Sequence, residues 1–259
     1  MNHKAMKKIS NILRKALIYF YYTGRPNIIN PIHHLRVYYE GLCVNTLKTK
    51  HKELFKYIAQ MVYLNDYVGC EYGDCLELYN TIKRLKPRYV LECGSGISSC
   101  VIAYALKENY VETNMGSKLI SLEENPLYYE QIERLFPNEL KIYVEFVLSE
   151  RVEKKYGDYL GCHYKDVPDY PYSFVYIDGP LLRKNATSQK CFNSDLLNIF
   201  TRSNITVDAL LDQRIGTYWV FKKCLPKAKI HYNVIKKLTS IYKTEGEGNY
   251  DNEKNSKKR

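Results

Sequence analysis

The spacing of hydrophobic positions divides the chain into an N-terminal helical region and a body of alternating strands and helices. In residues 6–20, apolar side chains recur every three or four positions, which predicts an amphipathic helix that stops before Gly24 and Pro26. A second helical pattern covers residues 50–64. Residues 243–259 contain almost no large apolar side chains, so we expect a disordered tail there.

From residue 71 onward, short apolar runs alternate with helical patterns. The runs are typical of buried strands and lie at residues 88–93, 118–122, 141–148, 172–177, 205–211 and 229–235. The helical patterns lie at residues 76–85, 98–107, 126–135 and 219–224. This alternation predicts an α/β fold: a doubly wound, mostly parallel sheet covered by helices on both faces. The chain then divides into a basic helical N-terminal extension (1–65), an α/β domain (66–242) and a tail (243–259).

Composition and charge narrow the classes of protein. Of the 259 residues 45% are hydrophobic and 14% aromatic, which excludes a largely disordered chain. The net charge of +11 is concentrated in residues 1–56, where eleven Lys and Arg face two Glu, while residues 57–259 carry 28 basic and 26 acidic residues. The partner of the basic segment therefore need not be the ligand of the body.

Several classes of location and partner are disfavoured. No apolar run is long enough to span a membrane, and no secretory signal is recognised, so a cytoplasmic protein is expected. The eight cysteines lack metal-binding spacing and are expected to be reduced thiols. No nucleic-acid-binding module is present, so no nucleic-acid partner is expected. The basic, aromatic-flanked pattern of residues 6–22 suits the surface of an anionic membrane, at its inner face; the alternative is that this helix packs on the protein itself.

The strongest chemical signal is the segment Glu92-Cys93-Gly94-Ser95-Gly96-Ile97-Ser98, at a predicted strand–turn–helix junction. Ligands of such sheets bind beyond the carboxyl ends of the strands, and glycines allow the backbone to approach them closely. The next strand ends in Glu123-Glu124, where a carboxylate can accept both hydroxyls of a ribose; Glu123 is preferred because it directly follows the apolar strand. A nicotinamide site would require glycine at Ser99, and an acid beside the turn suits a cationic ligand better than a pyrophosphate.

With these motifs, residues 70–240 resemble the class I S-adenosylmethionine-dependent methyltransferases. The likeness rests on Glu92-x-Gly94-x-Gly96-x-Ser98, on the strand that ends in Glu123, and on Phe174-Val175-Tyr176-Ile177-Asp178-Gly179-Pro180. Ser98 stands where the family more often has a third glycine. The resemblance implies a Rossmann-like methyltransferase fold over residues 66–242 and a cofactor site for S-adenosylmethionine. Its residues would be Glu92, Gly94, Ser95, Gly96, Ser98, Glu123 and Asp178, with Ser149 near the adenine.

The fourth predicted strand ends in Asp178-Gly179-Pro180-Leu181, which differs from the Asn/Asp-Pro-Pro-Tyr/Phe sequence of enzymes that methylate amino groups of nucleic-acid bases. An oxygen acceptor is therefore favoured. Asp178 and Asp212 are expected at neighbouring strand ends, where they could hold Mg²⁺. Alternatively, Asp178 acts as the base and Arg214 binds an anionic acceptor.

The predicted function is O-methylation of a carbohydrate, another glycan or a different small metabolite, with Asp178, Asp212 and Arg214 as catalytic residues. Two alternatives stay open: a nicotinamide-dependent oxidoreductase, and a non-catalytic module that binds nucleotide-like ligands. The oligomeric state is left open.

Overall fold

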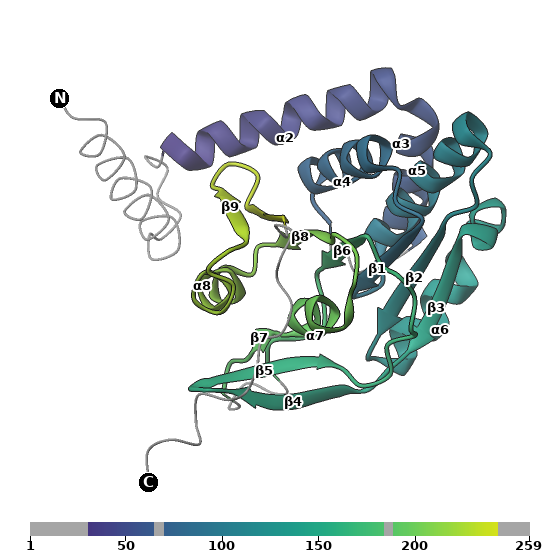
Figure 1. Ribbon diagram of the computed structural model, residues 1–259. Helices are drawn as coiled ribbons and strands as arrows, with labels where there is room; N and C mark the ends of the chain where they lie inside the picture. The colour runs from purple at the N-terminus through teal and green to yellow at the C-terminus, as the bar shows by residue number, and fades with distance from the viewer. Residues whose placement is uncertain (1–30, 65–69, 184–188, 243–259) are drawn as a thin grey trace, which may run out of the picture.

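The structure is a computed structural model that describes residues 31–64, 70–183 and 189–242 (Figure 1). The helix predicted at residues 6–20 and the tail predicted at 243–259 lie outside the described residues. The described helices are α2 (Pro31–Lys50), α3 (Lys52–Leu64), α4 (Tyr72–Leu85), α5 (Ile97–Thr113), α6 (Pro126–Leu135), the 3₁₀ helix η1 (Asn138–Tyr143), α7 (Asp195–Arg202) and α8 (Ile215–Cys224). None of these helices is both long and apolar enough to cross a membrane.

The central sheet has seven strands in the order β3-β2-β1-β6-β8-β10-β9. They are β1 (Tyr89–Cys93), β2 (Lys118–Glu123), β3 (Val144–Leu148), β6 (Phe174–Ile177), β8 (Asp208–Asp212), β9 (Lys229–Asn233) and β10 (Leu238–Tyr242). Neighbours from β3 to β8 pair in parallel, whereas β10 is antiparallel to both β8 and β9. The predicted α/β, doubly wound, mostly parallel sheet is confirmed. The antiparallel β10, inserted beside β8, distinguishes this sheet from the parallel 3-2-1-4-5-6 order of dinucleotide-binding folds.

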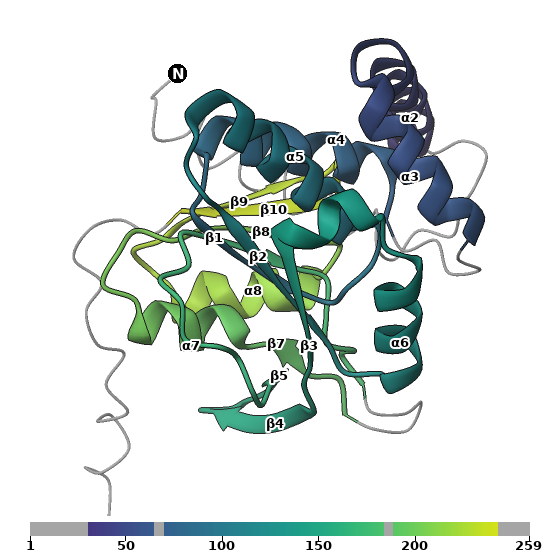
Figure 2. The ribbon, with the colours of Figure 1, turned by 90° about the vertical axis from the view of Figure 1, so that its right-hand side faces the viewer.

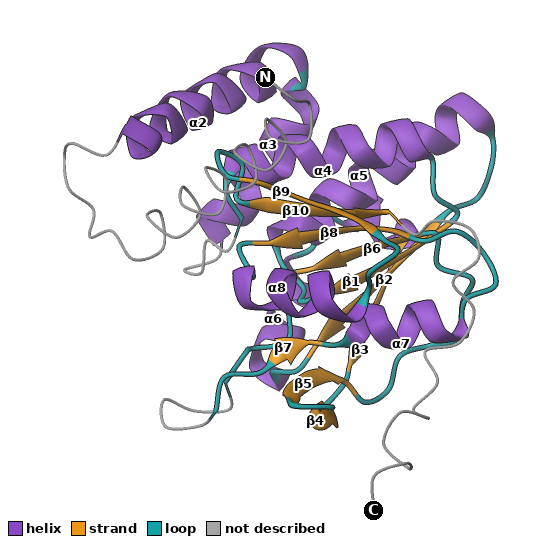
Figure 3. Ribbon diagram, turned by 60° about the vertical axis from the view of Figure 1, so that its left-hand side comes forward, coloured by secondary structure: helices purple, strands orange, loops and turns teal. Residues whose placement is uncertain are grey.

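Two hydrophobic clusters cover the two faces of the sheet. Figures 2 and 3 show the helices that lie on these two faces. Helices α3, α4 and α5 pack over one face, and α7 and α8 lie under the other. Almost every residue of β1, β2, β6 and β8 is buried, as expected of parallel strands covered on both sides. This arrangement leaves the carboxyl ends of the strands as the place where polar groups can reach a ligand.

Helices α2 and α3 are joined to the α/β core by their own apolar residues. Leu47 of α2 and Leu54, Ile58 and Met61 of α3 are completely buried in the cluster that also contains α4 and α5. The start of α4 fits closely under α2, because the amide of Gly73 donates to Glu40 Oε2 at 3.1 Å. A Cβ at position 73 would lie 2.5 Å from Glu40 Oε1, so any larger residue would displace the Glu40 side chain.

Some elements have other bounds in the structure than the sequence pattern predicts, and others were not predicted. The strand predicted at residues 141–148 starts only at Val144, because Asn138–Tyr143 form the 3₁₀ helix η1. Three elements that the pattern did not indicate form a second region below the sheet: the hairpin β4 (Arg151–Tyr156) and β5 (Tyr159–Tyr164), and β7 (Phe192–Asn193), which pairs with β5. β4 was missed because its RVEKKY sequence carries charges on an exposed strand, where periodicity gives little signal. Helix α7 and strand β10 were also missed.

The eight cysteines, which the sequence analysis expects to be reduced thiols, are free thiols in the structure. All eight lie within the described residues, none forms a disulfide, and most are buried. The thiol of Cys75 donates a hydrogen bond to Sγ of Cys70 at 3.4 Å.

Candidate functional site

Two glycines bring the turn after β1 against the loop after β6. Gly94 has φ +98°, a left-handed conformation that side chains rarely adopt, and a Cβ there would lie 2.8 Å from the amide nitrogen of Gly179. A Cβ on Gly179 would in turn lie 2.7 Å from Gly94 Cα and 2.5 Å from the Tyr164 hydroxyl. The amide of Asp178 also donates to the carbonyl of Cys93 at 2.8 Å. The two predicted site segments are therefore in direct backbone contact.

Glu92 lies beneath this turn and organises it. Its side chain is fully buried, and Oε2 accepts hydrogen bonds from the hydroxyls of Ser99 at 2.5 Å and Ser121 at 2.6 Å. The Ser99 oxygen accepts a hydrogen bond from the amide of Gly96 at 3.0 Å. The Glu92 carboxyl is therefore linked to the start of α5 through the Ser99 hydroxyl. Burial raises the pKa of Glu92 to about 7, against the opposing effect of the serine hydroxyls, and Oε1 has no partner.

The surface of the turn is open above Gly96. A Cβ added there would meet nothing within 4 Å, and Gly94, Ser95 and Gly96 are all partly exposed. Ser98, by contrast, is buried, and its hydroxyl acts to lower the pKa of Glu92. Of the turn residues predicted to hold a cofactor, the three at positions 94–96 lie at the surface, and Glu92 and Ser98 support them from below.

Adjacent carboxylates at the end of β2 contact different parts of the site. Glu123 accepts the Ser95 hydroxyl at 2.8 Å and the amide of Asn125 at 2.9 Å, so it is tied to the glycine turn. Its burial raises the pKa of the carboxyl. Glu124 accepts the Tyr164 hydroxyl at 2.7 Å and the amide of Leu181 at 2.9 Å, so it is tied to the loop after β6.

Ser149 lies directly after β3, at the next strand end. Its amide donates to the carbonyl of Glu123 at 2.9 Å, and its hydroxyl accepts the amide of Asp166 at 2.8 Å. The side chain is buried, so the structure places Ser149 beside the β2 end while its oxygen is engaged with the chain that follows β5.

Asp178 directly follows β6, and Asp212 is the last residue of β8. These two strands pair in parallel, so the two residues lie at neighbouring strand ends, as the sequence predicts. A hydrogen bond joins the two carboxyls, and Arg214 Nη2 lies 3.3 Å from Asp178 Oδ1. Burial raises the pKa of Asp178 to about 6 and that of Asp212 to about 8; the Arg214 charge and the bond from Asp212 oppose the rise at Asp178. Asp178 is therefore the more readily ionised member of the pair.

Arg214 is fixed by several acceptors and not only by Asp178. Its Nη1 donates to the carbonyl of Pro180 and to Asn193 Oδ1, both at 3.2 Å. Asn193 in turn donates to the carbonyl of Gly179 at 2.8 Å. This network holds the Asp178-Gly179-Pro180 loop, which contains a cis Gly179–Pro180 bond, against β7 and the start of α8.

The residues that the sequence reasoning missed come from α2 and α4. Asp74, in the first turn of α4, is 2% exposed, and burial together with the charge of Asp212 raises its pKa to about 9. Arg36 of α2 forms an ion pair with Glu71, the residue directly before α4. The charges of Asp74 and Asp212 also act on Arg36. Sequence periodicity started the helix at residue 76, so Asp74 carried no signal as a site residue.

The pair Asp178–Asp212 does not fit the predicted Mg²⁺ site. The two carboxyls hydrogen-bond each other, and a guanidinium already lies beside Asp178. Among the described residues, no group of three or more His, Cys, Asp or Glu side chains is arranged to hold a metal ion, and Mg²⁺ needs near-octahedral oxygen ligation.

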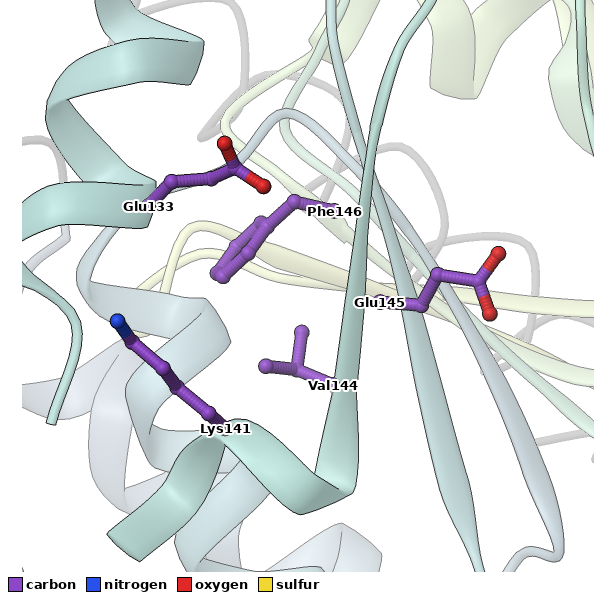
Figure 4. Close-up of a pocket in the computed structure, with 5 residues that line it drawn as sticks. All are labelled: Glu133, Lys141, Val144, Glu145 and Phe146. Atoms are coloured by element: carbon purple, nitrogen blue, oxygen red, sulfur yellow. The ribbon is translucent and has the colours of Figure 1, made fainter. Parts of the chain in front are cut away.

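A separate hollow of about 460 Å³ lies at the outer edge of the sheet (Figure 4). It is lined by Glu133, Lys141, Val144, Glu145 and Phe146, and Figure 4 shows the carboxyl group of Glu145 on the opposite side of β3 from Phe146. Because Val144 begins β3, this hollow is beside the amino end of an edge strand, whereas the glycine turn and the carboxyl groups are at the carboxyl ends.

Comparisons with known proteins give similarities of structure alone. No model of a known protein family matches the chain, and no curated protein sequence matches it. Among solved structures, a methyltransferase from Geobacter sulfurreducens is 11% identical, with a TM-score of 0.48 over 74% of this chain and 90% of that one. The O-methyltransferase TomG from Streptomyces achromogenes, solved with S-adenosylmethionine, is 11% identical (TM-score 0.45, 74% and 89%). An O-methyltransferase from Bacillus cereus, solved with S-adenosylhomocysteine, is 14% identical (TM-score 0.44, 74% and 90%). Similarities of this strength do not decide which reaction this chain carries out.

Proposed function

We propose that the protein transfers a methyl group from S-adenosylmethionine to an oxygen atom of a small metabolite, with carbohydrates as the favoured class. The observation that supports this most is a single hydrogen-bonded unit: the open turn of residues 94–96 is joined through Ser95 to Glu123 at the end of the next strand. A turn that a ligand can approach closely, next to a carboxylate for a ribose, suits a nucleoside ligand.

The residues fit this cofactor. A carboxylate can accept about four hydrogen bonds, so Glu123 retains capacity for ribose hydroxyls after its bonds to Ser95 and Asn125. The space over Gly96 leaves room at the start of α5, whose first amides can bind a carboxylate group. Glu92 lies under the turn, and its ionised form would favour a cation over a pyrophosphate there.

Ser99 and the sheet order disfavour the nicotinamide alternative. The third glycine of a dinucleotide turn permits close packing of helix on strand. Here that position is Ser99, whose hydroxyl is engaged with both Glu92 and the amide of Gly96. The Ser99 hydroxyl therefore holds the glycine turn in place, where a dinucleotide-binding turn would have no side chain.

The mechanism needs little covalent chemistry from the protein. Bound S-adenosylmethionine supplies a methyl group that is already activated. The turn and Glu123 would orient the donor, and Arg214 and Asn193 fix the loop that carries Asp178. Asp178, held partly ionised by Arg214, would accept the proton that the acceptor hydroxyl loses. Alignment of the two reactants provides the greater part of the rate enhancement.

Thermal unfolding with added ligands tests this proposal. S-adenosylmethionine or S-adenosylhomocysteine at millimolar concentration should raise the melting temperature, because both bind the folded state, whereas NAD should not. Transfer of a tritiated methyl group to a small-molecule extract then separates an enzyme from a binding module. A shift with NAD and none with the two sulfur ligands would contradict the proposal.

A further inference from the structure

Two thiols lie against each other at the start of α4. Cys75 is in the first turn of this helix and is completely buried, whereas Cys70, two residues before the helix, is half-buried. The Cys75 thiol donates a hydrogen bond to Sγ of Cys70 at 3.4 Å, and the Cys70 thiol donates to the carbonyl of Glu71 at 3.7 Å. The same carbonyl accepts the amide of Cys75 at 3.0 Å. The two sulfurs are therefore already in contact, and solvent reaches one of them.

Glu71, which directly follows Cys70, links this pair to the site of Asp178. Its Oε1 accepts a hydrogen bond from Nε2 of Gln213 at 3.4 Å. Gln213 directly precedes Arg214, whose Nη2 lies 3.3 Å from Asp178 Oδ1. The charge of Asp178 also acts on Cys70 itself. A change at the two thiols therefore takes place next to the residues proposed to serve the acceptor.

A redox-sensitive pair of cysteines has one sulfur that an oxidant can reach and a second, resolving cysteine beside it. Cys70 and Cys75 have these two positions. We propose that they form a reversible disulfide when the protein meets a peroxide, and that this bond slows turnover at the site of Asp178. Formation of the disulfide depends on the two thiols alone, whereas its effect on turnover rests on the proposed function.

The oxidation balances with hydrogen peroxide as the oxidant. The Cys70 sulfur attacks one peroxide oxygen, the O–O bond breaks, and water leaves, which makes Cys70 a sulfenic acid. The Cys75 sulfur then displaces the hydroxyl group, which takes the Cys75 proton and leaves as a second water. The two sulfurs together lose two electrons, and the two peroxide oxygens gain them. The hydrogen bond from Cys75 and burial raise the pKa of Cys70, so thiolate is scarce and the pair responds to prolonged exposure.

Formation of the bond moves atoms beside the acceptor site. The two Sγ atoms must approach from 3.4 Å to about 2.05 Å, the length of a disulfide bond. Cys75 belongs to the buried cluster on one face of the sheet, so we expect Cys70 to make most of this movement and Glu71 to move with it. The hydrogen bond from Gln213 to Glu71, already long at 3.4 Å, is then lost. The chain that carries Arg214 thereby loses one of its attachments.

Peptide mass measures the disulfide directly. Trypsin cuts after Lys56 and Lys83, and the peptide of residues 57–83 contains Cys70 and Cys75 and no other cysteine. The full chain is incubated for hours with hydrogen peroxide, then blocked with iodoacetamide and digested. We expect this peptide to lose two hydrogen atoms and to take up no alkyl group. After treatment with dithiothreitol it should take up two.

The rate of methyl transfer measures the effect on turnover. Peroxide-treated protein is freed of peroxide and assayed with tritiated-methyl S-adenosylmethionine and a small-molecule extract. Its rate should fall about tenfold, because a displacement of about 1 Å near a reacting group can cost up to about a hundredfold, and dithiothreitol should restore it. In Cys70→Ser the rates before and after peroxide should be equal. Cys224→Ser, which removes another half-buried thiol in α8, is the matched control and should respond as the wild type does.

The two measurements separate the possible failures. If the peptide of residues 57–83 still takes up two alkyl groups after peroxide, no disulfide forms and the inference is wrong. A disulfide that leaves the wild-type rate unchanged, or an equal fall in Cys70→Ser, overturns its effect on turnover. If the reduced wild type neither binds S-adenosylhomocysteine nor transfers label, the proposed function fails together with the effect on turnover, and the peptide mass still decides whether the disulfide forms.

Discussion

At the residue scale, Glu123 and Glu124 show how neighbouring positions in the chain are assigned to different contacts. Successive side chains near a strand end point to opposite sides. Glu123 therefore meets Ser95 in the glycine turn, and Glu124 meets Tyr164 and the amide of Leu181. Only the first is placed beside the open turn, and this gives a specific expectation for donor binding.

Glu123→Ala should weaken binding of S-adenosylhomocysteine by roughly 1.5–3 kcal/mol, the range for hydrogen bonds to a charged group. Isothermal titration calorimetry measures this directly. Glu130→Ala, on the exposed surface of α6, is the control and should bind as the wild type does. Equal affinities of Glu123→Ala and the control would remove Glu123 from the donor site.

Asp74 predicts a pH dependence of folding stability. Its pKa is raised to about 9 in the folded state, against roughly 3.9 in an unfolded chain. The stability of the folded state is then full below about pH 4 and declines as pH rises toward 9, because the unfolded chain releases the proton more easily. The slope is at most about 1.4 kcal/mol per pH unit for each such carboxyl.

Asp74→Asn, which stays neutral at every pH, should reduce this decline. Urea unfolding should show the variant more stable than the wild type at pH 8.5, by a margin several times larger than the margin at pH 5. A wild-type stability that rises between pH 5 and 8.5, with the variant parallel to it, would mean that Asp74 is ionised in the folded protein.

At the scale of elements, the contact between the β1 turn and the β6 loop leaves no room for side chains. The backbones at Gly94 and Gly179 approach so closely that a Cβ on either would lie under 3 Å from backbone atoms of the other segment. Displacement of one segment must therefore displace the other, which couples the donor turn to the loop that carries Asp178.

Gly179→Ala should accordingly lower the melting temperature and weaken S-adenosylhomocysteine binding together, because the new methyl group forces the Gly94 turn away. Differential scanning fluorimetry with and without ligand measures both effects. Gly41→Ala is the matched control: its Cβ would meet nothing within 4 Å within α2, so it should stabilise the protein by about 0.5–1 kcal/mol. Normal ligand binding by Gly179→Ala would show that the turn and the loop move independently.

How far the sequence predicts these elements depends on how much of their structure is local. Helix α6 begins at Pro126 as predicted, because Asn125 caps it and the proline suits the first turn. The ends of β1, β2 and β8 were found because buried parallel strands are continuous apolar runs. The role of Asp74 was not visible, since only the packing of α4 beside β8 brings it to Asp212. The same holds for Arg36, whose partners lie far along the chain.

At the scale of the whole molecule, the positive charge is concentrated in the N-terminal part of the chain. Residues 57–259 are nearly neutral, and the excess of basic residues lies in residues 1–56. Helix α2 uses one of these bases, Arg36, within the fold. The segment at residues 6–20 is outside the described residues, and its proposed contact with an anionic membrane stays a prediction.

Co-sedimentation with vesicles tests that prediction. The full chain should bind vesicles with anionic lipid at low salt and release them as salt rises, because exposed charges are screened. A chain without residues 1–25 should not bind. If the shortened chain sediments equally well, residues 6–20 are not the membrane contact.

The position of β10 in the sheet has a consequence for synthesis of the chain on the ribosome. Strand β8 ends at Asp212, but the strand that pairs with its outer edge begins only at Leu238. At roughly 5–20 residues per second, those intervening residues take about 1–5 s to be added. During that interval β8 presents unpaired backbone groups, which can pair with another nascent chain. Chains truncated before residue 238 should therefore aggregate, even though they contain the glycine turn and the carboxyl groups of Asp74, Asp178 and Asp212.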